Sequence, residues 1–183
     1  EWDFASVADV TTESMFAEME AAVKAPTGGV EITKGGDLTA VKPAKTIEAL
    51  YGAPFLAHAT MEPMNATVHV REGEAEVWAP TQSQTRAQQW VGQLLGIPPE
   101  KVIVHTTFLG GGFGRRSVPD VIVQAAEISR AVNAPVQLVW SREEDVKHDF
   151  YRPGAKAQLR AMFDENNKPI GFEAVVASGS IMK

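Results

Sequence analysis

The chain has 183 residues, a formal net charge of −6, a sequence pI near 5.2 and 44% hydrophobic residues. This length allows one domain with a short appendage, and the acidic balance argues against a sequence-independent nucleic-acid binder, which needs a basic surface. The absence of cysteine excludes disulfides, zinc–thiolate sites and cysteine-bound iron–sulfur clusters within the chain. No apolar run reaches the roughly 18 residues expected of a membrane-spanning helix.

The first part of the chain is predicted to be a helix followed by a connector. Apolar residues recur at three- and four-residue steps over residues 11–24, behind a threonine that can cap the helix. The sequence from there to about residue 45 is typical of a linker. We therefore divide the chain into a helix with its connector, residues 1–46, and a partial domain over residues 47–183.

The domain is predicted to alternate short strands with two main helices. Residues 67–71 and 75–79 form a hairpin of two strands around a Glu-Gly-Glu turn. A helix follows, with Thr81 and Gln84 as its capping box, and Gly96 ends it.

The second main helix follows a strand and a glycine-rich segment. The strand covers residues 101–108, and the helix opens near Val118 with Ser117 and Asp120 in a capping pattern. Ser141 and Glu144 resemble the cap of a short helical turn. Three more strands are expected, at residues 135–140, 155–163 and 169–177. Hairpins mixed with helical crossovers predict an α+β fold with a mixed sheet.

The glycine-rich segment, residues 110–114, is the sharpest local feature. Four glycines in five positions permit positive φ angles and close approach of the backbone to a ligand. The following helix N-terminus, together with Arg115 and Arg116, favours an anion such as a phosphate or an oxo-metal group. A tight strand-to-helix turn with a packing phenylalanine explains the same spacing equally well. The segment matches neither the P-loop nor the dinucleotide-binding fingerprint.

Three other segments carry candidate polar residues. His58 and Glu62 have the spacing of a helical metal pair, but flanking prolines disfavour a helix, so a structural histidine is the favoured interpretation. Gln82 is not needed for capping the helix that follows it. The acidic run at residues 143–145 is interpreted as a solvated helix start, and Arg152 as a candidate cleft residue for which a surface role is the more common one.

Taken in this order, the segments resemble the molybdenum hydroxylases of the xanthine oxidase and aldehyde oxidase family. Ala-His-Ala-Thr-Met-Glu-Pro-Met at residues 57–64 and Gly-Gly-Gly-Phe-Gly-Arg-Arg at residues 110–116 resemble in particular the isoquinoline 1-oxidoreductase beta subunit type. The resemblance covers roughly residues 37–183. Because the chain also stops at Lys183 directly after a strand-like run, we expect a fragment of a large subunit that binds the molybdenum cofactor.

The resemblance implies positions for the cofactor. The backbone amides of Gly112, Phe113 and Gly114 would lie beside the molybdenum centre, and Gln82 would be a polar contact on the cofactor side. The cofactor implied for the full enzyme is molybdopterin cytosine dinucleotide, with none expected on the fragment itself. The implied partners are the rest of the large subunit and an iron–sulfur subunit, which agrees with the lack of cysteine here.

Two departures from the family pattern bear on the substrate. Leu56 stands where many members have a glutamine that donates to an oxo group, and Ser117 stands where purine-oxidising members have a glutamate. The resemblance therefore implies an N-heteroaromatic or aldehyde substrate, hydroxylated with water as the oxygen source, and Ser117 and Arg152 are substrate-side candidates. The family's catalytic glutamate lies near the C-terminal end of a much longer subunit, so no catalytic residue is expected in this chain.

This gives an expectation for the isolated chain and leaves two alternatives. We expect it to be inactive, to expose an apolar surface and to self-associate through that surface. The alternatives are a non-catalytic module that binds an anion or nucleotide at the glycine-rich segment, and a structural domain without a ligand.

Overall fold

The computed structural model describes residues 9–25 and 28–180, and the chain forms two compact units. Unit 2 is continuous, Ala57–Tyr151, whereas unit 1 combines Glu1–Leu56 with Arg152–Lys183. The division expected after residue 46 therefore differs from the one in the structure, because strands from both ends of the chain pair with each other in unit 1.

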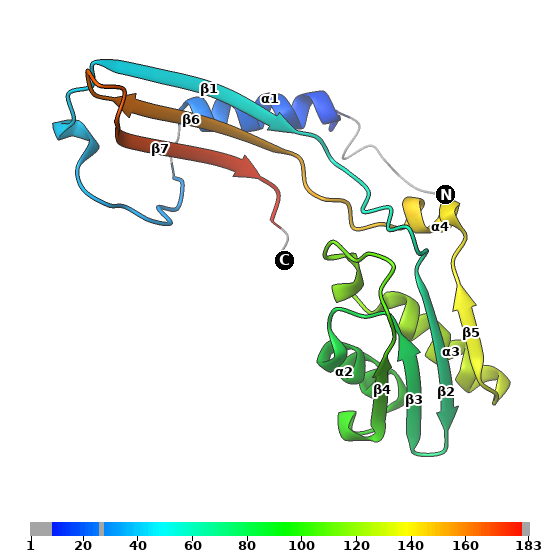
Figure 1. The fold of residues 1–183 in the computed structure, drawn as a ribbon. Coiled ribbons are helices and arrows are strands. Elements are labelled where there is room, and N and C mark those ends of the chain that lie inside the picture. The colour runs from blue at the N-terminus through cyan, green and yellow to red at the C-terminus, as the bar shows by residue number, and fades with distance from the viewer. Residues whose placement is uncertain (1–8, 26–27, 181–183) are drawn as a thin grey trace. The chain divides into compact units, whose positions relative to one another are not determined.

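The elements are shown in Figure 1. The helices are α1 (Thr12–Lys24), α2 (Gln84–Leu95), α3 (Asp120–Val132) and α4 (Arg142–Lys147). The strands are β1 (Lys45–Ala53), β2 (Asn65–Arg71), β3 (Glu74–Ala79), β4 (Val102–Thr106), β5 (Val136–Val139), β6 (Ala155–Phe163) and β7 (Pro169–Ser178). Short 3-10 turns occupy Leu38–Ala40, Pro99–Lys101 and Arg115–Ser117. Among the described residues, none of the helices has the length and apolarity required to cross a membrane.

Unit 2 is built on a mixed four-stranded sheet. Its order is β4-β3-β2-β5, with β3 and β4 parallel and the other pairs antiparallel. Alternate residues of β2 and β3 are fully buried, so the helices α2 and α3 cover one face of this sheet. The core cluster consists of Met64, Ala66, Val68, Ala75, Val77, Ala79, Ala87, Val91, Val102, Val121, Ile122, Ala125 and Ala126. This unit confirms the α+β fold with a mixed sheet, a hairpin and two main helices.

Unit 1 is built on a separate antiparallel sheet of three long strands. Its order is β1-β6-β7, and α1 packs against β6 and β7 (Figure 1). Strand β1 was not among the expected strands, because its partner β6 lies about a hundred residues further along the chain. Fully buried apolar side chains are few here, with Val23 and Met162 the two among the described residues of this unit.

Two of the expected helix caps are wrong. Helix α2 starts after Ser83, and the Thr81 hydroxyl accepts from the Ser83 N–H, while the Gln84 amide donates to Thr106 across the unit. Helix α3 follows Pro119 and has no side-chain cap, so Ser117 and Asp120 do not form one. The Ser141 cap is confirmed, since its hydroxyl accepts from the Glu144 N–H at 3.2 Å.

Candidate functional site

The glycine loop, residues 110–114, leaves β4 in a strained, left-handed course. Gly111 and Gly114 have φ angles of 102° and 101°, and Phe113 has a φ of 53°. A positive φ at one or more of these glycines was predicted and is confirmed. The loop runs into the 3-10 turn Arg115–Ser117 before α3 begins, and the Phe113 side chain is 75% exposed. Positive φ at a non-glycine residue costs free energy, so the surrounding contacts must hold this shape.

Hydrogen bonds on both sides of the loop hold it. The Gly110 N–H donates to Glu62 Oε2 at 2.8 Å, and the Glu62 N–H donates back to the Gly110 carbonyl at 3.1 Å. The Gly114 N–H donates to Gln82 Oε1 at 3.0 Å, and the Gln82 N–H donates to the Arg116 carbonyl. Gln82 and Gly114, both predicted site residues, are thus in direct contact. The Gly114 amide is already engaged and is not free for a ligand.

The interpretation of Arg115 as a cation facing a ligand is wrong. Its side chain is buried, and its guanidinium binds both carboxylate oxygens of Asp120, at 3.0 and 2.7 Å. Its Nε lies 3.3 Å from Asp149 Oδ1, and the guanidinium carbon lies over the rings of Trp140 and Phe150 at 5.5 and 4.9 Å. Two carboxylates therefore neutralise this cation inside the fold.

Arg116 is likewise buried and binds the loop from behind. Its Nε donates to the Gly111 carbonyl at 2.8 Å, and its Nη2 donates to the Glu62 carbonyl at 2.6 Å and lies 3.1 Å from Glu62 Oε2. Burial lowers the pKa of this guanidinium from its ordinary value, and the Glu62 carboxylate opposes that effect. Both arginines therefore stabilise the fold from inside through hydrogen bonds and ion pairs. The sequence did not reveal this role, because no sequence pattern distinguishes a buried arginine from an exposed one.

Three consecutive backbone donors in the loop remain unpaired. Among the described residues, the N–H groups of Gly111, Gly112 and Phe113 donate to no acceptor. Gly112 is itself buried, and buried N–H groups are rarely left unpaired. Successive N–H groups in a segment of alternating φ sign form concave sites that suit anions and oxo groups. The loop therefore fits an anionic or oxo-bearing ligand by its backbone, without help from the arginine side chains.

His58 lies beside this loop and is fixed by a carboxylate. Its backbone N–H and its Nδ1 both contact Asp149, with Nδ1 at 2.8 and 3.0 Å from the two oxygens. A Cβ atom on Gly114 would lie 3.9 Å from His58 Nε2, so this nitrogen faces the loop. No group of three or more histidine, aspartate or glutamate side chains in the described part of the chain could hold a metal ion.

The substrate-side candidates lie in different units. Ser117 lies in unit 2 directly after the loop, half-buried, with its N–H donating to the Gly114 carbonyl and its own carbonyl accepting from Arg86. Arg152 lies in unit 1, where its backbone pairs with Leu56 and its guanidinium donates to the Pro54 carbonyl at 3.2 Å. The structure therefore brings Gly112, Phe113, Gly114, Gln82 and Ser117 together within one unit.

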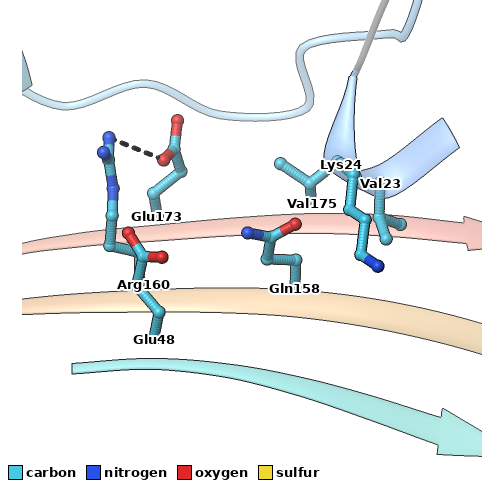
Figure 2. Close-up of a pocket in the computed structure, with 7 residues that line it drawn as sticks. All are labelled: Val23, Lys24, Glu48, Gln158, Arg160, Glu173 and Val175. Carbon is cyan, nitrogen blue, oxygen red and sulfur yellow. Dashed lines mark ion pairs between the residues drawn. The ribbon is translucent and has the colours of Figure 1, made fainter. Parts of the chain in front are cut away.

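Unit 1 contains a separate polar hollow of about 210 Å³ between α1 and its sheet (Figure 2). It is lined by Val23, Lys24, Glu48, Gln158, Arg160, Glu173 and Val175. Arg160 and Glu173 form an ion pair at 2.9 Å, whereas Gln158 Oε1 and Arg160 Nε are buried and have no hydrogen-bond partner in the part of the chain that the structure describes. No sequence pattern indicates this hollow, because its lining residues come from four elements that come together only in the fold.

Comparison with known proteins assigns the family. A family model described as the molybdopterin cofactor-binding domain matches residues 20–180. The chain belongs to this family. It is 33% identical over 159 residues to the isoquinoline 1-oxidoreductase subunit beta of Brevundimonas diminuta, a match that covers 82% of this chain and 20% of that protein. A membrane-bound aldehyde dehydrogenase (pyrroloquinoline-quinone) of Gluconacetobacter polyoxogenes is 32% identical over 130 residues, 70% of this chain and 17% of that one. The chain thus spans about a fifth of the length of these relatives.

Solved structures of molybdenum hydroxylases share the fold of this domain. The quinoline 2-oxidoreductase of Pseudomonas putida 86 matches 72% of this chain and 17% of its own, with a TM-score of 0.62 at 20% identity. The CO dehydrogenase of Oligotropha carboxidovorans matches 74% of this chain and 17% of its own, with a TM-score of 0.62 at 19% identity. The resemblance drawn from the sequence motifs is confirmed, and the chain is a molybdopterin-binding domain of the xanthine oxidase family.

Proposed function

We propose that this chain forms one wall of the cofactor site in the large subunit of a molybdenum hydroxylase, with the glycine loop facing the molybdenum end of the cofactor. The observation that supports the proposal most directly is the run of unpaired N–H groups at Gly111, Gly112 and Phe113. When bound, the cofactor supplies the two-electron oxidation of an N-heteroaromatic or aldehyde carbon, with water as the source of the inserted oxygen. Its proposed form is molybdopterin cytosine dinucleotide.

The chain's own residues bind and orient in this proposal. The loop amides donate to an anionic or oxo oxygen. Gln82 Oε1 already accepts from the Gly114 N–H, so the amide nitrogen of Gln82 is left to donate towards the cofactor. Glu62 and Arg116 keep the loop in its strained course from behind.

The substrate and partners follow from the same proposal. Ser117, in place of a carboxylate, disfavours a purine, and Ser117 and Arg152 remain the substrate-side candidates. The catalytic base and the iron–sulfur clusters would come from the rest of the large subunit and from an iron–sulfur subunit. We accordingly expect this chain by itself to show no hydroxylase activity.

The proposal can be tested by a matched pair of glycine substitutions in the full-length subunit. Gly114→Ala adds a methyl group that meets only His58 Nε2, at 3.9 Å, and Gly73→Ala adds one in open space at the β2–β3 turn. Both positions have positive φ, so each substitution should destabilise the fold by about 1–3 kcal/mol. We expect Gly114→Ala alone to lower molybdenum content about tenfold, the size of effect known for groups that support a metal site.

Two outcomes would contradict the proposal. One is a wild-type enzyme, isolated with its partner subunit, that contains no molybdenum by elemental analysis. The other is a Gly114→Ala enzyme with the same molybdenum content as Gly73→Ala. In either case, binding of inorganic phosphate to the loop, followed by amide chemical shifts at Gly111, Gly112 and Phe113, would identify a simple anion-binding module instead.

A further inference from the structure

We infer that His58 is a direct ligand contact of the cofactor site, with its Nε2 atom accepting a hydrogen bond from an N–H or O–H of the group bound at the glycine loop. The inference rests on the proposed function and adds an acceptor to it. The loop supplies donors only, at Gly111, Gly112 and Phe113. A ligand that carries an oxo or anionic oxygen next to an N–H or O–H group would satisfy both the loop donors and the His58 Nε2 acceptor.

The His58 ring is held in one tautomer. The ionised Asp149 carboxylate can only accept hydrogen bonds, so the ring nitrogen in contact with it, Nδ1, carries the proton. The backbone N–H of His58 also donates to Asp149, which ties the ring and its own main chain to the same carboxylate. In the neutral ring, Nε2 is then left with a free lone pair.

A further layer of buried groups fixes the carboxylate. The Asp149 side chain is 2% exposed, and Arg115 Nε lies 3.3 Å from its Oδ1. The Arg115 guanidinium in turn donates hydrogen bonds to both carboxylate oxygens of Asp120 and lies over the rings of Trp140 and Phe150. Burying several charged groups costs free energy unless they are well paired. Here the paired charges of Asp149, Arg115 and Asp120 hold the His58 imidazole in one orientation. Asp149 and Arg115 are therefore positioning residues, which orient the His58 ring, and His58 is the residue that contacts the ligand in this inference.

The free nitrogen faces the space beside the loop. His58 Nε2 has no hydrogen-bond partner among the described residues, and 16% of the side chain is exposed. Gly114 of the loop lies in front of this nitrogen, since a Cβ atom on Gly114 would be 3.9 Å from His58 Nε2. The absence of a side chain at Gly114 leaves the space in front of Nε2 open. An accessible acceptor, His58 Nε2, thus lies close to the unpaired N–H donors of the loop, which is what a ligand with both kinds of group requires. A histidine that served packing alone would need neither the open space in front of Nε2 nor a fixed tautomer.

Two substitutions in the holoenzyme separate the two ends of the ring. His58→Asn keeps an amide near the Nδ1 position, where it can still donate to Asp149, but ends before the Nε2 position. His58→Gln reaches the Nε2 position with a polar group and loses the match to Asp149. His148→Asn is the matched control, because His148 is an exposed histidine of the same unit that pairs with Glu144.

The readouts are molybdenum content per folded subunit, with folding checked by circular dichroism, and the electron paramagnetic resonance signal of the reduced molybdenum centre. We expect His58→Asn to lower molybdenum content about tenfold and to alter the signal, His58→Gln to recover part of both, and His148→Asn to match the wild type. Equal molybdenum content in the two His58 variants, or a higher content in His58→Asn, would overturn the inference. A wild-type enzyme without molybdenum would instead refute the proposed function.

Discussion

Buried arginines give the glycine loop its shape. The loop contains several residues at positive φ, including Phe113, and such a backbone persists only where its surroundings determine it. Arg116 supplies that determination by binding the Gly111 carbonyl and the Glu62 main chain at once. The planar guanidinium can donate in several fixed directions, which an ammonium group cannot match.

Arg116→Lys is therefore expected to destabilise the chain although it preserves the charge. A lysine cannot reach the Gly111 and Glu62 carbonyls together, so buried acceptors lose their donor, and we expect a loss of about 3 kcal/mol in the free energy of unfolding. Arg86→Lys is the control, because Arg86 makes one hydrogen bond from an exposed position. Urea unfolding of both variants measures the difference, and equal stabilities would show that the buried guanidinium is not needed.

The sequence predicted which residues of the site come together but not how they are used. The resemblance implied that Gln82 and the glycine loop share the cofactor side, and in the structure Gln82 accepts a hydrogen bond from the Gly114 N–H. A contact of Gln82 with the cofactor stays a prediction. Arg115 and Arg116 were assigned to the ligand, since nothing local in the sequence says that Asp120, Asp149 and Glu62 would neutralise them inside the fold. Asp120 is close to Arg115 in the sequence, but Asp149 and Glu62 lie far from the two arginines in the chain, so no local pattern indicates that these groups are buried together.

At the scale of elements, close packing reverses a common rule for helical glycines. Replacing glycine by alanine inside a helix usually stabilises it by about 1 kcal/mol. In α2, however, a Cβ on Gly92 would lie 2.9 Å from the Ile97 carbonyl oxygen and 3.4 Å from the Pro99 backbone. Backbone atoms of the tight turn after the helix cannot move aside cheaply.

Gly92→Ala should consequently destabilise the chain by about 1–3 kcal/mol, the usual cost of overpacking. Gln93→Ala, at the exposed neighbouring position of α2, should leave stability unchanged or slightly raised. Thermal unfolding of the two variants provides the comparison. A Gly92→Ala variant more stable than the wild type would show that the backbone of the turn after α2 can shift to accommodate the added methyl group at little cost in free energy.

Helix α1 is tied to its sheet by an ion pair that acid should break. The hydrogen bond from Lys24 and then that from Lys156 on β6 lower the pKa of Glu20. Because the folded pKa lies below the unfolded one, the stabilisation is complete above the ordinary glutamate pKa and is lost as the pH falls through the lowered folded value.

We therefore expect the α1 amides to exchange faster with solvent on acidification through that range in the wild type. Glu20→Gln should exchange faster already at neutral pH and should show less pH dependence. Glu18→Gln, on the exposed side of α1, serves as the control. Hydrogen exchange followed by mass spectrometry gives the measurement, and identical acid profiles of the wild type and Glu20→Gln would exclude the ion pair as the anchor.

Element boundaries were predictable where the signal was local. The ends of β6 and the glycine that ends α2 agree with the sequence patterns, because a turn or a left-handed cap marks them. Strand β1 was missed because its apolar residues do not alternate strictly with polar ones, since Leu50 stands between Ala49 and Tyr51. Its pairing with β6 depends on residues far along the chain, and the same long-range pairing places the division between the units at Leu56 rather than after residue 46.

At the scale of the whole molecule, the two units differ in how they bury apolar surface. Unit 2 holds a contiguous core beneath its mixed sheet. In unit 1, the strand register places Glu48, Arg160 and Glu173 on the face next to α1. The opposite face presents apolar side chains to solvent: Ile47, Tyr51, Phe172 and Val176 are 47%, 58%, 61% and 64% exposed. A contiguous apolar sheet face of this kind usually marks an interaction surface.

This face should make the isolated chain bind apolar dyes and self-associate. The double substitution Phe172→Ser with Val176→Ser removes the two most exposed of these four side chains, both on the edge strand β7, so we expect weaker fluorescence of an apolar dye and a shift towards monomer in sedimentation. Ile32→Ser removes a still more exposed apolar residue, at 94%, outside the sheet and should change neither quantity, because single exposed apolar residues are ordinary on protein surfaces. A wild-type chain that stays monomeric at high concentration and binds no dye would contradict the prediction, since the face would then be too small or too dispersed to drive association.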